Sequence, residues 1–264
     1  MKEKKTKRTS VSKSVKKQRK YRLKPEVKLY FLVVIISVLF VIVSFTVLFK
    51  VRNISVQNCE KYSQQEVIEA SGIQKGSNLL ILNKSKVKKN VCEKFPYVQD
   101  VEIIKKLPNS VEIHLNLEVP DFFIEYNEEY FLISKSGKVL EKSESEFTGF
   151  LRVNGLNLYN LAESNVIKYK NNEDELLLRQ IKECAEKIFE RDIYSIDISD
   201  MTKINCNYKD KINIIIGDTN EINYKLLTAK EIIDNKLEEK TKGNLDVRGV
   251  AVDNTSYFTP VQSK

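Results

Sequence analysis

The sequence predicts an α+β protein with a single N-terminal transmembrane helix and two domains outside the membrane. Three observations support this fold class. Residues 29–49 form an uncharged apolar run, and residues 51–119 carry strand-like and helix-like patterns in turn. Residues 121–253 contain mainly short strand patterns with two longer amphipathic helices, which predicts a mixed β-sheet domain with helices.

The apolar run from Leu29 to Phe49 has the length of a membrane span. As a helix, its 21 residues would extend roughly 31 Å, about the thickness of the hydrocarbon core of a bilayer. A buried core helix is the alternative, but such helices rarely stay apolar on every face. Lys50-Val51-Arg52 follows the run instead of a small-residue cleavage site, so we expect an uncleaved signal anchor.

The charge distribution predicts the orientation of this anchor. Residues 1–28 hold 13 Lys and Arg and only two acidic residues, which favours a cytoplasmic N-terminal tail. Residues 29–264 hold 31 basic and 34 acidic residues, so the net charge of +8 comes from the tail. Only Tyr21 in the tail could stack on a base, and we therefore predict no nucleic-acid partner. The expected protein is single-pass and type II, with most of the chain extracytoplasmic.

The first outer domain is expected over residues 50–120. Its helices have clear end signals: Ser63 and Glu66 form a capping box, Gly72 suits a left-handed C-terminal cap, and Pro96 stops the second helix. The strand after Ser110 alternates between apolar and polar residues, as a strand with one buried face does. The predicted order is strand 51–56, a helix starting after Ser63, helix 85–94, strand 98–106 and strand 111–119.

The second outer domain is expected over residues 121–253. We expect its last helix to end near Lys240 with Gly243 as the cap, and residues 254–264 to form a weakly ordered tail. The predicted elements are a hairpin of 130–133 and 138–141, strand 150–153, helix 173–191, strands 193–198, 203–208 and 211–216, helix 223–240 and strand 245–252.

Residue patterns that indicate catalysis are scarce. The single histidine, His114, lies on the polar face of a predicted strand, where an exposed sheet residue is the simpler interpretation than a general base. Glu125, Glu128 and Glu129 could imitate a glycosidase pair, but they cluster in an expected polar loop. No glycine-rich nucleotide motif occurs, so we predict no cofactor. With one histidine and no CxxC spacing, we also predict no metal site. These observations favour a binding protein over an enzyme.

The four cysteines and one run of lysines leave alternatives open. Cys59, Cys92, Cys184 and Cys206 permit disulfides outside the cell, but Cys92 and Cys184 lie on apolar helix faces, which favours free thiols. The basic face over residues 84–89 could contact lipid headgroups or a partner, and an ordinary solvated helix face is the alternative.

The order of these patterns resembles the bacterial cell-division proteins of the FtsQ/DivIB family. Within residues 50–120, the resemblance rests on Gly76-Ser77-Asn78-Leu79-Leu80, Pro96-Tyr97-Val98, Val101, Lys105-Lys106, Pro108, Val111, Ile113, Leu115, Glu118 and Pro120. Further on it rests on the hairpin 132–139, Asn154-Gly155, Ile214 to Gly217, Lys225-Leu226 and Leu245 to Arg248. The resemblance implies a POTRA domain at 50–120 and a β-domain at 121–253.

The same resemblance implies a non-enzymatic scaffold of the division machinery at the septum. Such proteins bind FtsL and FtsB (DivIC) outside the membrane and help to control septal peptidoglycan synthesis. Two other functions stay open from the residues: an anchored enzyme acting on peptidoglycan, and a POTRA-type secretion or transport adaptor. The enzyme would need an acid pair or a nucleophile in a cleft, and the adaptor would normally carry repeated POTRA units.

We predict that a partner binds by adding a strand to the C-terminal edge of the β-domain. An edge strand has unpaired backbone N–H and C=O groups that a partner segment can use. The alternative is that this strand pairs only within the domain. The predicted edge and its two apolar anchors comprise Asp246, Val247, Arg248, Gly249, Val250, Ala251, Val252, Tyr257 and Phe258.

Overall fold

The computed structural model describes residues 24–159 and 161–261, which belong to two separate units divided after Phe49. Helix α1 (Pro25–Leu48) is long and apolar enough to cross a membrane, and none of its residues is buried by protein. Pro25 occupies the first turn, where its missing N–H costs nothing. Most of the predicted cytoplasmic tail, residues 1–23, lies outside the described residues.

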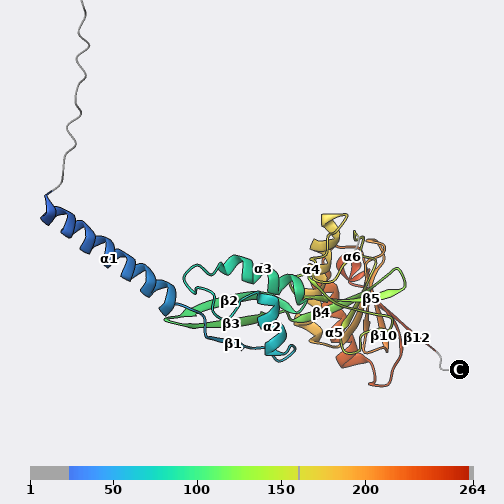
Figure 1. Cartoon of the computed structure of the whole chain (residues 1–264). Helices are drawn as coiled ribbons and strands as arrows, with labels where there is room; N and C mark the ends of the chain where they lie inside the picture. The colour runs from blue at the N-terminus through green and yellow to red at the C-terminus, as the bar shows by residue number, and fades with distance from the viewer. Residues whose placement is uncertain (1–23, 160, 262–264) are drawn as a thin grey trace, which may run out of the picture. The chain divides into compact units, whose positions relative to one another are not determined.

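The second unit begins with a small α+β domain (Figure 1). Its sheet has the order β1-β3-β2, with β1 parallel to β3 and β2 antiparallel to it. The predicted order of strand, helix, helix, strand, strand is confirmed. The elements are β1 (Asn53–Gln57), α2 (Gln64–Ser71), α3 (Lys84–Lys94), β2 (Val98–Lys106) and β3 (Ser110–Leu117).

The expected side chains form both ends of α2, and a cap that was not predicted, Asn83, begins α3. The Ser63 hydroxyl accepts from the Glu66 N–H, and the Glu66 carboxylate accepts from the Ser63 N–H at 3.0 Å. Gly72 closes α2 in the left-handed conformation at φ 69°. Asn83 caps α3 by accepting from the Lys86 N–H at 3.1 Å. Local hydrogen bonds therefore set both helix starts.

The β-domain is one mixed sheet of nine strands in the order β12-β11-β10-β9-β8-β7-β4-β5-β6. Figure 1 shows helices α4 and α5 beside this sheet. They contact each other and the sheet, and apolar residues of both helices belong to the core. The elements are β4 (Pro120–Tyr126), β5 (Glu129–Ser134), β6 (Val139–Ser143), β7 (Leu151–Asn154), α4 (Asn172–Phe189), β8 (Ile193–Asp197), β9 (Ile204–Tyr208), β10 (Ile212–Gly217), α5 (Ile222–Lys236), β11 (Gly243–Asp246), α6 (Val250–Asp253) and β12 (Tyr257–Pro260).

Strand β4 was absent from the sequence prediction, which placed Glu125 in a polar loop. In the structure β4 pairs with both β5 and β7 and so lies inside the sheet. Its residues Phe122, Phe123 and Ile124 are all buried, because both faces of the strand are covered. A strand buried on both faces lacks the period-two pattern from which half-buried strands are recognised.

The prediction for the end of the chain is wrong at three points. Helix α5 ends at Lys236 rather than near Lys240, and Gly243 begins strand β11 instead of capping the helix. The strand expected over 245–252 stops at Asp246. The tail expected to be weakly ordered contains strand β12, which pairs with β11. Residues 262–264 lie outside the described part of the chain.

Hydrogen bonds join the two domains of the second unit. The buried Lys138 of the β5–β6 hairpin donates from Nζ to the Val98 carbonyl at 2.8 Å and to the Cys92 carbonyl at 3.3 Å. The Tyr97 hydroxyl donates to the Glu141 carboxylate at 2.7 Å. Burial lowers the pKa of Lys138, so its ammonium depends on these carbonyl acceptors.

Candidate functional site

Strand β12 forms an edge of the nine-stranded sheet. It pairs antiparallel with β11 in a register that places Tyr257 opposite Asp246 and Pro260 opposite Gly243. In the described residues, no strand pairs with its other side. Strand β6, at the opposite edge, is partly covered because the Val139 N–H donates to the Asn165 carbonyl at 2.9 Å. The open edge therefore lies at β12.

The register shows which backbone groups of β12 face outward. The Val261 N–H donates to the Lys242 carbonyl at 2.9 Å, so these two residues form a hydrogen-bonded pair. Pairs alternate along an antiparallel ladder, and Phe258 therefore directs its N–H and C=O away from β11. Pro260 directs a carbonyl outward and has no N–H. The open edge offers one donor and two acceptors.

Phe258 and Gly243 attach β12 to the domain. Phe258 is half-buried and packs against the main core, whereas the side chain of Tyr257 is 67% exposed. A Cβ on Gly243 would lie 2.7 Å from Phe258 Cζ and closer still to the Thr259 carbonyl oxygen. Gly243 is therefore required for the close approach of β12 rather than for a helix cap. The sequence predicts a structural role for Gly243 but places it at the end of the last helix instead of in β11.

The remaining predicted edge residues do not form a strand. Val247 is buried, and Gly249 precedes the short helix α6, which contains the predicted strand residues Val250, Ala251 and Val252. The chain turns because the Val250 N–H donates back to the Val247 carbonyl at 3.2 Å. Of the nine predicted residues, Asp246 belongs to β11, and Tyr257 and Phe258 belong to β12.

Arg248 contacts both the end of β11, at Asp246, and the end of β10, at Gly217. Its guanidinium donates to both carboxylate oxygens of Asp246, with Nη2 to Oδ2 at 2.6 Å, and lowers the pKa of Asp246. The Arg248 side chain also covers Gly217, where a Cβ would lie 2.7 Å from Arg248 Cγ. Gly217 has φ 80°, a conformation in which other residues are strained.

A buried lysine beside this region was not predicted as a site residue. Lys225 on α5 is 2% exposed, and its Nζ lies 2.6 Å from Asp218 Oδ1. This contact lowers the pKa of Asp218. Lys225 also donates to the Asp218 carbonyl at 3.4 Å, so it holds the turn between β10 and α5. An isolated lysine in an amphipathic helix gives no sequence signal of this role.

The residues considered for catalysis are spread over both domains. His114 is half-buried on β3, with Nε2 3.4 Å from Glu112 Oε2. Glu125 pairs with Arg152 at 2.8 Å, and Glu128 lies in the β4–β5 turn at φ 63°. Among the described residues, no group of three or more His, Cys, Asp or Glu side chains is placed to hold a metal ion.

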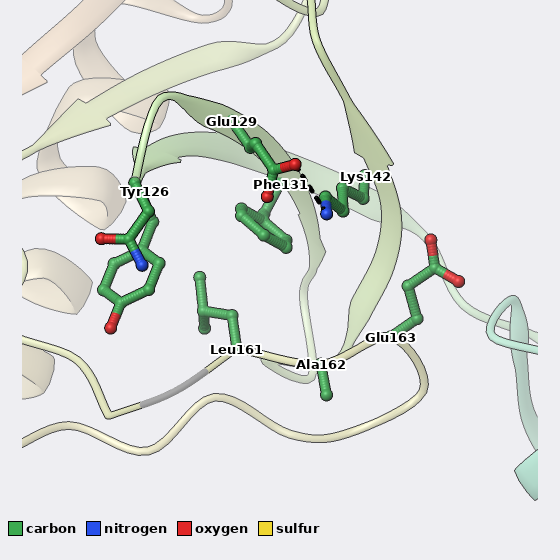
Figure 2. Close-up of a pocket in the computed structure, with 8 residues that line it drawn as sticks. Tyr126, Glu129, Phe131, Lys142, Leu161, Ala162 and Glu163 are labelled. Atoms are coloured by element: carbon green, nitrogen blue, oxygen red, sulfur yellow. Dashed lines mark ion pairs between the residues drawn. The ribbon is translucent and has the colours of Figure 1, made fainter.

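Glu129 lies in a shallow hollow of about 500 Å³ on the β-domain. Figure 2 shows its carboxylate directed toward Lys142 on one wall, with Leu161 and Ala162 on the other side. The Lys142 ammonium lies 2.7 Å from Glu129, and the carboxylate is thus held in an ion pair. A second acidic residue, Glu163, also lines this hollow, but the Glu129 carboxylate is held by Lys142.

The four cysteines are free in the structure. Cys206 is fully buried in the β-domain core, and burial raises its pKa to about 12. Cys59, Cys92 and Cys184 are partly buried, and burial also raises the pKa of Cys92 and of Cys184. A raised pKa keeps a thiol protonated and therefore weakly nucleophilic. Cys184 and Cys206 therefore contribute to the packing of the core rather than to a reactive site.

The fold and the open edge define a class of protein: a membrane-anchored chain with one small α+β domain followed by a β-domain that ends in an exposed strand. Residues 49–116 match the family described as POTRA domain, FtsQ-type. The POTRA domain that the family resemblance implies is therefore confirmed.

Comparison with known proteins identifies the family. The chain is 30% identical to the cell division protein DivIB of Clostridium acetobutylicum over 75% of its own length and 79% of the relative's. It is 29% identical to DivIB of Clostridium tetani, over 79% of this chain and 78% of the relative. Cell division protein FtsQ of Corynebacterium glutamicum is 30% identical over 40% of this chain and 47% of the relative. The chain belongs to the DivIB/FtsQ family of cell division proteins.

Proposed function

We propose that the chain is a non-enzymatic bitopic scaffold of the division machinery, located at the septum. Its N-terminus is cytoplasmic, and its outer domains bind FtsL-like and FtsB- or DivIC-like partners to organise septal peptidoglycan synthesis. The names of the relatives support a role in division. The basic residues before α1 support the orientation, because such residues are retained in the cytoplasm.

The observation that carries the binding proposal is the open edge at β12. A partner segment adds there as a further strand, pairing with the outward N–H and C=O of Phe258 and the outward C=O of Pro260. The exposed Tyr257 ring supplies an apolar contact beside this backbone. The partner-binding edge is thereby reassigned from 246–252 to 257–260, while Tyr257 and Phe258 keep their proposed role.

No observation in the described residues favours either alternative function, the anchored peptidoglycan enzyme or the secretion or transport adaptor. Glu125 and Glu129 are each paired with a basic side chain, which does not favour a peptidoglycan hydrolase. The family match covers one POTRA unit, whereas a secretion adaptor would normally carry several. The scaffold therefore explains the structure better.

The test compares two substitutions at Phe258. Phe258→Ala removes the anchoring ring and keeps the outward N–H, whereas Phe258→Pro removes both. Residues 50–264 are titrated by calorimetry with the extracytoplasmic segments of the FtsL- and DivIC-like proteins from the same bacterium. We expect the proline variant to bind at least tenfold more weakly than the alanine variant.

Two outcomes would count against the proposal. Equal affinities of the two folded variants would contradict strand addition at β12. Failure of the unmodified domains to bind these partners, singly or together, would contradict the scaffold itself. A periplasm-active enzyme fused after Lys264 tests the orientation, because it becomes active only if the C-terminus lies outside.

A further inference from the structure

Three segments of the POTRA domain carry basic residues and no acidic ones. They are residues 50–53, residues 75–86 and residues 104–110, and together we call them the basic rim. The rim contains seven Lys and Arg residues, although the whole chain after residue 28 has an excess of acidic residues. The basic residues are Lys50, Arg52, Lys75, Lys84, Lys86, Lys105 and Lys106.

Hydrogen bonds hold the three segments of the basic rim together. The Val51 N–H donates to the Ser77 carbonyl at 2.9 Å, and the Gly76 N–H donates to the Val51 carbonyl at 2.8 Å. The Arg52 N–H donates to the Asn109 carbonyl at 2.8 Å. The rim is therefore one continuous surface, built around the first residues that follow the membrane helix.

Apolar side chains project from the same surface. Ile81 is 82% exposed and Leu107 is 61% exposed, whereas the neighbouring Leu79 is fully buried. Lys105 Nζ donates to the Leu80 carbonyl at 3.0 Å, which ties the loop before α3 to the end of β2. Apolar area that can be buried and electrostatic attraction to anionic lipids are the two contributions that bind amphipathic segments to a bilayer surface, and this surface offers both.

The lysines at the start of α3 do not stabilise that helix. Lys84 and Lys86 lie in its first turn, which contains no acidic residue. The N-terminal end of a helix dipole is positive and favours acidic side chains there. These lysines are also exposed, and none of the ion pairs of the described residues includes them, whereas Lys106 is paired with Glu112 at 2.6 Å. The charge of Lys84 and Lys86 is thus available for an external anionic surface.

The chain places the first residue of the basic rim next to the end of α1. Only Phe49 separates the end of α1 from Lys50, the first residue of the rim. A chain advances at most about 3.5 Å per residue, so Lys50 lies within about 7 Å of the last residue of α1. Six of the seven basic residues are lysines, whose flexible stems suit a fluid array of phosphates better than one fixed partner.

We propose that the basic rim docks onto the anionic phospholipid headgroups of the membrane that anchors the chain. The lysines bind the phosphates, and Ile81 and Leu107 enter the boundary between headgroups and acyl chains. The proposal rests on the membrane anchorage of the proposed function but not on any protein partner. Docking would restrict the tilt of the POTRA domain on its anchor.

The chain contains no tryptophan, which allows a single fluorescent probe at the rim. The full chain carrying Ile81→Trp, which we call the rim probe, is reconstituted in nanodiscs that contain acyl-brominated lipids, either with phosphatidylglycerol or with phosphatidylcholine alone. We expect bromine to quench the rim probe at least twofold in the anionic discs and much less in the zwitterionic ones. Val252→Trp is the matched control, because Val252 is 88% exposed in the β-domain.

Charge reversal tests whether the lysines of the rim cause the docking. In the chain that carries the rim probe, Lys75→Glu, Lys84→Glu and Lys86→Glu together should abolish the quenching in anionic discs. The same charge change at the exposed Lys187, Lys236 and Lys240 should leave it unaltered.

Three results would overturn the proposal. They are equal quenching in the two kinds of disc, quenching that survives reversal of the rim lysines, and a response of the rim probe to the FtsL- or DivIC-like segments but not to lipid. The last result would assign the rim to a protein partner. Co-purification of the chain with the nanodisc reports the anchor separately, so anchorage and docking can fail independently.

Discussion

At the scale of single residues, the ion pair of Lys225 and Asp218 stabilises the turn between β10 and α5. The lysine is buried, and the carboxylate that neutralises it is half exposed. A buried ammonium without an acid beside it is strongly unfavourable, so the partner matters more than an exposed ion pair would.

We expect Asp218→Ala to destabilise residues 50–264 by about 2 kcal/mol. The loss is smaller than for an ion pair with two buried partners, because Asp218 is half exposed. Urea unfolding followed by circular dichroism measures this change. Adding Lys225→Met should restore most of the loss, because the double variant buries no charge. If the double variant is as unstable as the single one, the lost charge pairing is not the cause.

The same pair predicts a pH dependence. Lys225 lowers the pKa of Asp218 below its ordinary value of 3.8, so the stabilisation is fully present above about pH 3.8. It is lost as the pH falls through the lower, folded-state pKa. The difference in stability between the unmodified domains and Asp218→Asn should therefore shrink in acid. Urea midpoints from pH 7 downward would show this convergence.

At the scale of elements, β12 depends on the absence of a side chain at Gly243. An added methyl group would meet Phe258 and the Thr259 carbonyl. We expect Gly243→Ala to cost about 1–3 kcal/mol, as overpacking typically does. Hydrogen exchange should show the loss of protection concentrated in residues 257–261.

Asn244→Ala is the matched control, because Asn244 is the exposed neighbour on the same strand and should alter protection little. If Gly243→Ala leaves residues 257–261 as protected as before, Gly243 does not govern the attachment of β12. The same variant should weaken partner binding if the strand is the binding edge.

Local patterns predicted most elements because their determinants are local. Ser63 and Glu66 cap α2 through neighbours in sequence, and Pro96 follows α3 directly. The exceptions depend on distant contacts. Leu245 and Val247 alternate as a strand does, yet the chain turns after them into α6, and β12 is defined only by pairing with β11.

The candidate site was predicted in part for the same reason. The sequence predicts Tyr257 and Phe258 as apolar anchors from their side chains. Their strand is not recognised because it has only four residues and the last of them is Pro260. Val250 and Val252 are β-branched, which is only a weak strand signal, and the turn at Gly249 overrides it.

At the scale of the whole molecule, Lys138 joins the POTRA domain to the β-domain. Its ammonium is buried between carbonyls of Cys92 and Val98, at the end of α3 and the start of β2. Hydrogen bonds to a charged group contribute about 1.5–3 kcal/mol, more than those between neutral groups. These hydrogen bonds therefore help to hold the two domains together.

We expect Lys138→Met to separate the unfolding of the two domains, because the methionine fills the space but leaves both carbonyls without this donor. Calorimetry of residues 50–264 should change from one transition to two. Lys135→Met, on the same hairpin but 60% exposed, should keep a single transition. A single transition in both variants would show that other contacts couple the domains.

The composition of the open edge also bears on self-association. Two copies of a strand that pair with each other must each supply N–H donors as well as C=O acceptors. The outward side of β12 has one N–H donor, at Phe258. Pro260 adds a second outward carbonyl but no N–H. A second copy of the same strand is thus a poor complement, whereas a different segment with two well-spaced N–H groups is a good one. Proline at this position lets the chain expose a strand permanently without becoming a template for its own fibres.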